Sequence, residues 1–136
     1  MELTKQSKLL EDLKQAVERL KEAVVLEPTR INQDGTIQRF EFTFELSWKL
    51  MRTVLLVQGI DCFSPRDCIR KVAQAGLIDD PEKWFEFLKA RSLTTHVYDQ
   101  KMADKIYEKA KEFPKVVEEL MEKVEVELKE DNIGER

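Results

Sequence analysis

Apolar residues in the first 24 positions recur every seven residues, with others interleaved at steps of three and four, and this spacing constrains the fold more than any other feature. The positions are Leu3, Leu10, Leu13, Val17, Leu20 and Val24. Such spacing lines apolar side chains along one stripe of an α-helix, as in a helix that packs in a bundle. Pro28 ends this helix, because the residue before a proline is disfavoured in helical conformation.

A second helix is predicted from Thr36 to Gln58, between a turn at Asn32–Gly35 and a stop at Gly59. Its apolar residues form one face of Ile37, Phe40, Phe44, Trp48, Met51 and Leu55, and another of Phe42, Leu46, Leu50, Val54 and Val57. A helix that is apolar on two sides is buried on two sides. One face belongs to the core of the monomer, and the other requires a further helix or another subunit.

Glu41, Glu45 and Lys49 interrupt the apolar residues of this second helix at steps of four. One interpretation is a solvated strip with an exposed ion pair, which contributes little to stability. The other is that a carboxylate, assigned here to Glu45, faces a functional site and orients a cation there.

Two shorter helices follow, and each begins with a polar capping residue before a proline. Ser64-Pro65-Arg66-Asp67 supplies the cap, the first helical residue and an acidic group that reaches back, and Gly76 closes this short helix. Asp80-Pro81-Glu82 starts the next helix by the same chemistry.

The last helix is predicted to begin at Asp99, which can cap it. Its apolar residues again alternate steps of three and four: Met102, Ile106, Ala110, Phe113, Val117, Leu120 and Val124. Pro114 lies inside this pattern, so a kink or a break is expected near Glu112. The chain after Leu128 is expected to fray.

These helices predict an all-α fold, an up-and-down four-helix bundle with one short extra helix, that spans residues 1–136 as one domain. The composition agrees, because 37% of the residues are charged and only four are glycine and four proline, against about 25% charged residues in typical domains. No run approaches the roughly 20 apolar residues that a membrane span requires. We therefore expect a cytoplasmic protein without membrane contact.

Cys62 and Cys68 are the only cysteines in the chain. With a single distant histidine they cannot complete a four-ligand zinc site, so no metal and no cofactor is predicted. In a reducing cytosol we expect both as free thiols without a structural role. The formal net charge of −4 disfavours a general nucleic-acid binder, which normally carries a basic surplus, but it leaves room for a local basic pocket.

The stretch Arg-Ser-Leu-Thr-Thr-His-Val-Tyr, which begins at Arg91, holds the only histidine and interrupts the helical pattern. On one ideal helix Arg91 and His96 would point about 140° apart, at ~100° per residue, so they converge only if the helix is distorted between them. Thr94 and Thr95 are poor helix formers, and we place the distortion at this pair. Beyond it, His96 and Tyr98 share a side if the chain is extended.

Arg91 and His96 together suit the metal-free cleavage of RNA, in which a 2′-hydroxyl attacks its own phosphate. An imidazole with a pKa near ~6.5 can take and return a proton, and an arginine can hold a phosphate and stabilise developing charge. One histidine cannot be base and acid at once, so a homodimer that shares one cleft is the economical solution. The alternative is a lone histidine that makes one satisfied hydrogen bond in a helix turn.

Two stretches resemble the HEPN superfamily, in the branch called nucleotidyltransferase substrate-binding proteins. The first runs from Asp34 to Lys49, DGTIQRFEFTFELSWK, and is similar to that branch's signature in its second helix. The second is the pattern Arg-x4-His-x-Tyr at Arg91, His96 and Tyr98. The resemblance extends from the first helix to about Leu128.

This resemblance implies a helical bundle that dimerises, with two Arg-x4-His motifs across a cleft, and that binds a minimal nucleotidyltransferase encoded beside it. In one view of the family the bundle is the substrate-binding subunit of that pair. In the other it is the ribonuclease toxin of a toxin–antitoxin system, with Arg91 and His96 catalytic and RNA as the substrate. The partner then silences the toxin by attaching adenylate to Tyr98, whose added bulk and negative charge block the cleft.

Ser92 departs from the family pattern, which commonly has Asn, Asp or His after the motif arginine. A smaller hydroxyl orients Arg91 or a substrate group less well. The departure therefore bears on nuclease activity rather than on fold or partner.

Overall fold

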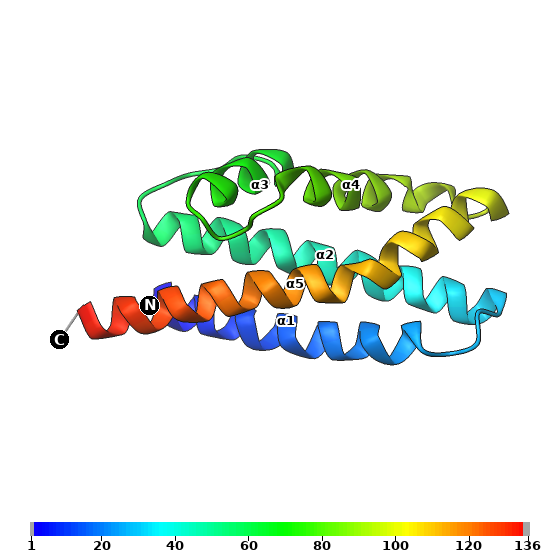
Figure 1. Ribbon diagram of the computed structural model, residues 1–136, viewed down its shortest axis with the longest axis horizontal. Helices are drawn as coiled ribbons and strands as arrows, with labels where there is room; N and C mark the ends of the chain where they lie inside the picture. The colour runs from blue at the N-terminus through cyan, green and yellow to red at the C-terminus, as the bar shows by residue number, and fades with distance from the viewer. Residues whose placement is uncertain (1, 135–136) are drawn as a thin grey trace.

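The chain folds into helices that pack as an up-and-down bundle (Figure 1). The computed structural model describes residues 2–134, and it describes side chains for residues 5–130. Its helices are α1 (Glu2–Val24), α2 (Arg30–Val57), α3 (Pro65–Gln74), α4 (Pro81–Ser92), the short 3₁₀ helix η1 (Leu93–His96) and α5 (Gln100–Gly134). No strand occurs among the described residues, so the all-α prediction is confirmed.

The bundle consists of four antiparallel segments, which run in alternate directions along the long axis of the molecule in Figure 1. The helices α1, α2 and α5 are the first, second and fourth segments, and α3 and α4 together are the third. This third segment packs on the side of α2 that faces away from α1. The short α3 is the extra helix that the sequence predicts. In the part of the chain that the structure describes, no helix is long and apolar enough to cross a membrane.

The periodic stripe of α1 lies in the core, as the sequence predicts. Leu10, Leu13, Val17 and Leu20 are buried, and Val24 is half-buried. The side chain of Leu3 lies outside the described residues. Burying such side chains contributes roughly 1.5–3 kcal/mol each, which is why this stripe determines how α1 packs.

The start of α2 differs from the sequence prediction. The helix begins at Arg30 and continues through Gly35, where the sequence predicts a turn. Thr29 caps the first turn, with its Oγ1 accepting a hydrogen bond from the Asn32 amide at 3.1 Å. This cap and the packing of α2 outweigh the cost of a glycine inside a helix, about 1 kcal/mol. The predicted stop is confirmed, because Gly59 has a φ of 80° directly after the C-cap Gln58.

Both apolar faces of α2 are covered to a large extent, as predicted. On the first face all members are buried except the half-buried Trp48. On the second face Leu50 and Val54 are buried, while Phe42, Leu46 and Val57 are half-buried. The second face therefore keeps apolar surface that the monomer does not cover.

An aromatic cluster around Phe113 of α5 joins this helix to α2 and α4. Its ring centroid lies 4.7 Å from Phe87, 5.1 Å from Phe40, 5.4 Å from Trp84 and 6.0 Å from Phe44. All five side chains are buried. Aromatic pairs at these distances contribute about 0.5–1.5 kcal/mol beyond the area that they bury. The cluster holds α4, and with it the segment that follows, against α2 and α5.

The caps of α3 and α4 are those that the sequence predicts. Ser64 Oγ accepts from the Asp67 amide at 3.1 Å, and Asp80 Oδ1 accepts from the Lys83 amide at 3.1 Å. In addition, Asp67 Oδ2 accepts from the Phe63 amide at 3.2 Å and lies 3.2 Å from Lys71 Nζ. These contacts hold the pKa of Asp67 below its ordinary value of 3.8, through the Phe63 hydrogen bond first and Lys71 second.

Cys62 and Cys68 form a disulfide, so the expectation of free thiols is wrong. The tight turn into α3 brings their Cα atoms to 5.1 Å, and both residues are fully buried. That separation is within the range in which a bridge forms. The expectation rested on the redox state of the cell, whereas the pairing depends on the turn that brings the two residues together in the folded chain.

The helix α5 runs without a break through Pro114, which is buried. In Figure 1 it changes direction between its yellow first turns and its red end. A kink is expected at this position, because proline removes one helical hydrogen bond and crowds the preceding turn. The helix α5 continues to Gly134, past Leu128, and the fraying that the sequence predicts there remains a prediction. Residues 135 and 136 lie outside the described residues.

Candidate functional site

The segment from Arg91 to Tyr98 lies at the turn between α4 and α5, at one end of the bundle. The α-helix ends at Ser92, and Leu93–His96 continue as a 3₁₀ turn. Thr94 Oγ1 donates to the Arg91 carbonyl at 2.8 Å, and the Asp99 amide donates to the His96 carbonyl at 3.1 Å. The distortion that the sequence places at Thr94 and Thr95 is therefore present as a tighter helical turn.

Arg91 is anchored by Glu45 of α2. Its Nε donates to Glu45 Oε1 at 3.1 Å, and the second oxygen of Glu45 accepts from Trp48 Nε1 at 3.0 Å. The Glu45 and Arg91 side chains are 36% and 30% exposed, so the pair is partly shielded from water. Of the two sequence interpretations, the structure therefore favours the one in which a carboxylate of α2 orients a cation. Since only Nε is engaged by Glu45, both terminal nitrogens of the guanidinium remain available for a ligand.

His96 and Tyr98 form a second pair. His96 Nδ1 lies 3.1 Å from the Tyr98 hydroxyl, and the two rings meet edge to face at a centroid separation of 5.8 Å. The tautomer decides which group donates, because a neutral imidazole has one donor and one acceptor nitrogen. Both residues are exposed, with Tyr98 84% accessible. Val97 between them has helical rather than extended backbone angles, so the predicted extended conformation is wrong although the side chains meet.

The structure does not join these two pairs within one chain. Among the described residues no hydrogen bond links Arg91 to His96. Ser92 Oγ donates to the Leu88 carbonyl one turn back at 3.0 Å, so its hydroxyl is used within α4 rather than on Arg91. Thr95 is exposed and makes no side-chain hydrogen bond among the described residues. Each chain thus presents a positioned arginine and an exposed histidine–tyrosine pair at one end.

Trp48 is the member of this site that sequence reasoning missed as a polar group. It stands three residues after Glu45, where two side chains meet on one helix face. The spacing of three residues is a sequence signal for this contact. Trp48 also fits the apolar face of α2, so its polar role does not stand out in the sequence.

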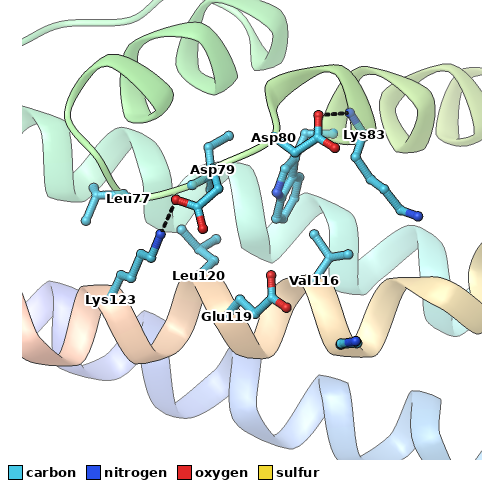
Figure 2. A pocket seen from close by; sticks show the side chains of 11 residues that line it. Leu77, Asp79, Asp80, Lys83, Val116, Glu119, Leu120 and Lys123 are labelled. Carbon is cyan, nitrogen blue, oxygen red and sulfur yellow. Dashed lines mark hydrogen bonds and ion pairs between the residues drawn. The ribbon is translucent and has the colours of Figure 1, made fainter.

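A pocket lies towards the other end of α4 (Figure 2). The connection between α3 and α4 lines one wall, and α5 lines the other; Asp79 and Lys123 pair across it at 2.7 Å. The buried Trp84 forms part of its lining. Trp84, which lines this pocket, lies seven residues before Arg91 on α4, a rise of roughly 10 Å at 1.5 Å per residue. It is separate from the motif.

No group of three or more His, Cys, Asp or Glu side chains is arranged to hold a metal ion within the described residues. The polar groups at the motif are one guanidinium, one imidazole, one phenol and one carboxylate that is already paired. This donor set is suited to binding an anion and to transferring protons.

The chain belongs to the family described as nucleotidyltransferase substrate-binding protein like, whose model matches residues 5–126. The family predicted from the two sequence stretches is thereby confirmed.

Particular relatives agree with this membership. A curated protein of Haemophilus influenzae, named probable ribonuclease HepT, is 36% identical over 84 residues, which are 58% of this chain and 58% of that protein. A solved structure from Thermus thermophilus has a TM-score of 0.76 and 30% identity, and covers 80% of this chain and 95% of its own. A Haemophilus influenzae structure, described as the fold of a substrate-binding domain of a nucleotidyltransferase, has a TM-score of 0.66 and 28% identity over 90% and 98% of the two chains.

Proposed function

We propose that this protein is a metal-independent ribonuclease that acts as a homodimer and is the toxin partner of a minimal nucleotidyltransferase. The observation that carries the proposal is the positioned Arg91, held by Glu45 with its terminal nitrogens available, close in sequence to the exposed His96. The HepT relative, a probable ribonuclease, supports it. The alignment spans only 58% of that relative's length, so the activity is a proposal for this chain.

The chemistry assigns separate roles to the two residues. Arg91 would hold the scissile phosphate and stabilise the charge that develops on its oxygens. His96 would take the proton of the attacking 2′-hydroxyl or return a proton to the leaving 5′-oxygen. Since each chain has one histidine, base and acid together require two chains.

The surface beside the motif supports a dimer contact. Between α4 and α5, next to η1, lies a hollow lined by the apolar Ala90, Leu93, Met102 and Ile106 together with the charged Glu86, Lys89, Lys105 and Lys109. Covering such surfaces is favourable at roughly 25 cal/mol per Å², and a contact here would bring two η1 segments together.

Cleavage is tested with His96→Ala and Arg91→Ala on a panel of single-stranded RNAs, in buffer with a chelator and without the partner. We expect the wild type to cut and both variants to lose at least about 100-fold in rate, as is typical for removing a general acid–base. Gln38→Ala is the control, because Gln38 is exposed on α2 and makes no side-chain hydrogen bond among the described residues. If the wild type cuts no RNA, the ribonuclease proposal is wrong.

We also propose that the nucleotidyltransferase adenylylates Tyr98. The phenol oxygen would attack the α-phosphorus of ATP, forming an O–P bond while pyrophosphate leaves and the phenol proton passes to a base, for which His96 Nδ1 at 3.1 Å is placed. The high exposure of Tyr98 supports access by a modifying enzyme.

Mass spectrometry after incubation with the nucleotidyltransferase and ATP tests this modification. We expect the added adenylate on Tyr98, and none on a Tyr98→Phe variant. Tyr107, the only other tyrosine, is buried and serves as the internal control. Adenylate on another residue, or on none, contradicts the proposal.

A second candidate function is a non-catalytic subunit that presents a substrate to the nucleotidyltransferase. The description of the family and of the Haemophilus influenzae structure favours it, and so does Ser92, which turns away from Arg91. The two functions separate on His96. A binding subunit would form the complex with the enzyme and leave RNA intact, whether or not His96 is replaced.

A further inference from the structure

A groove between α3 and α4 carries a surplus of positive charge. Arg66 and Arg70 of α3 line it, and Lys89 of α4 faces them. None of these three cations makes an ion pair with a carboxylate among the described residues. An acidic protein that leaves three cations of one groove unpaired has a local field that attracts polyanions, despite its net charge of −4.

The acidic residues of the groove offset this charge only in part. Glu82 and Glu86 also line it, but Glu86 pairs with Lys109 of α5, which reaches it from the far side of α4. The nearby Asp67 is engaged by Lys71 and by the Phe63 amide. Glu82 remains as a negative charge in the groove, but it makes no ion pair with Arg66 or Arg70 among the described residues, so both guanidiniums can bind an anionic ligand.

An aromatic platform lies in the same groove. The guanidinium of Arg66 lies over the ring of Phe85, 4.5 Å from its centroid, and Phe85 is only half-buried. Exposed aromatic rings and arginine planes are the surfaces on which unpaired bases stack, at about 1–3 kcal/mol per base. Phosphate-binding cations beside a stacking platform are typical of sites for single-stranded nucleic acid.

The groove ends at the motif. Ser92 and Leu93 line its last part, and Ser92 directly follows Arg91 in the chain. Arg66 and Arg70 stand one helical turn apart, about 6 Å along α3, a spacing suited to neighbouring phosphates of an extended strand. A strand bound along this groove would therefore reach the end of α4 that carries the motif, although Arg91 itself does not line the groove.

We propose that the groove lined by Arg66, Arg70, Phe85 and Lys89 binds the backbone of single-stranded RNA next to the site of cleavage. This inference rests on the proposed ribonuclease function and extends it to the substrate track. It assigns to α3 a role beyond completing the bundle.

The test measures binding separately from cleavage. All variants are made in the His96→Ala chain, and fluorescence anisotropy follows a labelled single-stranded RNA over a range of salt concentrations. We expect Arg66→Gln with Arg70→Gln to weaken binding about tenfold or more. The slope of log affinity against log salt should fall by about 1.4, at about 0.7 for each phosphate contact to a single strand.

Matched variants identify the cause. Arg19→Gln with Arg52→Gln removes two exposed arginines from α1 and α2, one of which lies over Phe42 at 5.1 Å much as Arg66 lies over Phe85; this pair should leave binding unchanged. Arg66→Lys with Arg70→Lys keeps the charge and should keep the salt slope while losing affinity through weaker stacking. Thermal unfolding confirms that each variant is folded.

Three results would overturn the inference. Binding with the wild-type slope in the Arg66→Gln, Arg70→Gln variant overturns the groove assignment, while the ribonuclease proposal survives if the wild type still cuts. If the Arg19→Gln, Arg52→Gln variant loses as much RNA affinity as the Arg66→Gln, Arg70→Gln variant, the RNA is attracted by the overall charge of the protein and not by this groove. Loss of nucleotidyltransferase binding with unchanged RNA affinity makes the groove a protein-docking surface instead.

Discussion

Glu45 contacts both Arg91 and Trp48, so at the scale of single residues it determines where the motif arginine points. A free arginine side chain carries about 2 kcal/mol of rotamer entropy, and a carboxylate that fixes one conformer removes part of that loss from substrate binding. In the proposed ribonuclease Glu45 would be a positioning residue, since it would act through Arg91.

We predict that Glu45→Gln lowers RNA cleavage about tenfold. The amide keeps an acceptor for Trp48 but loses the charge that holds Arg91, and hydrogen bonds to charged groups contribute about 1.5–3 kcal/mol. The free energy of unfolding should fall by less than about 1 kcal/mol, because the pair is partly exposed. Cleavage kinetics and urea unfolding measure both quantities.

Glu41→Gln is the matched control for that experiment. Glu41 lies one turn before Glu45 on α2 and makes no ion pair or side-chain hydrogen bond among the described residues. It should leave both activity and stability unchanged. Equal losses of activity in the two variants would mean that Glu45 acts only through the general charge of α2.

At the scale of elements, the connection between α2 and α3 is held by two kinds of bond. The Cys62–Cys68 disulfide closes it covalently, and Asp67 holds the Phe63 amide and Lys71. Lys71 Nζ also donates to the Asp61 carbonyl at 2.7 Å. Together these contacts fix the start of α3, and therefore the position of its two groove arginines.

The lowered pKa of Asp67 predicts how this connection responds to acid. Because the folded-state pKa lies below the ordinary value of 3.8, the contribution of Asp67 to stability is present above that value and is lost as the pH falls through the lowered pKa. Asp67→Asn should therefore be less stable than the wild type at neutral pH, and the difference should shrink in acid below pH 3.8.

Urea unfolding from neutral to strongly acidic pH measures that difference. Asp34→Asn is the control, because Asp34 is exposed on α2 and has no side-chain hydrogen bond among the described residues; its offset from the wild type should not vary with pH. A constant offset for Asp67→Asn would show that the Asp67 contacts do not depend on charge.

Helix type and order could be predicted because apolar spacing and proline caps are local signals. The start of α2 could not, because Gly35 and its neighbours read as a turn until the Thr29 cap and the packing of α2 are known. The disulfide could not be predicted either, because it depends on a distance between side chains that come together only in the folded chain. The sequence offered a cation-orienting Glu45 only as one of two interpretations, and the contact with Arg91 decides between them. Tertiary contacts decided each of these cases.

At the scale of the whole molecule, the separation of Arg91 from the His96–Tyr98 pair leads to a prediction about the cleavage rate of mixed dimers. If one cleft needs a histidine from each chain, wild-type and His96→Ala chains mixed in equal amounts leave about one quarter of the dimers fully wild type, for random pairing in a two-fold dimer. We predict that cleavage falls to about that fraction after the chains are unfolded and refolded together.

Two observations check this expectation. Mixing with Gln38→Ala chains should leave the rate unchanged, because those chains carry a complete motif. Activity of about one half in the His96→Ala mixture would show that each chain works alone, and the case for a shared cleft would then be lost.

Tyr98 is 84% exposed, and its one hydrogen bond is to another exposed side chain. Nothing in the core depends on its hydroxyl, so a group attached there would alter the reactive end without loosening the bundle. A chain silenced in this way would remain as long-lived as an active one. The nucleotidyltransferase would then switch off protein that stays folded in the cell. Removal of the adenylate from Tyr98 would restore activity without synthesis of new protein.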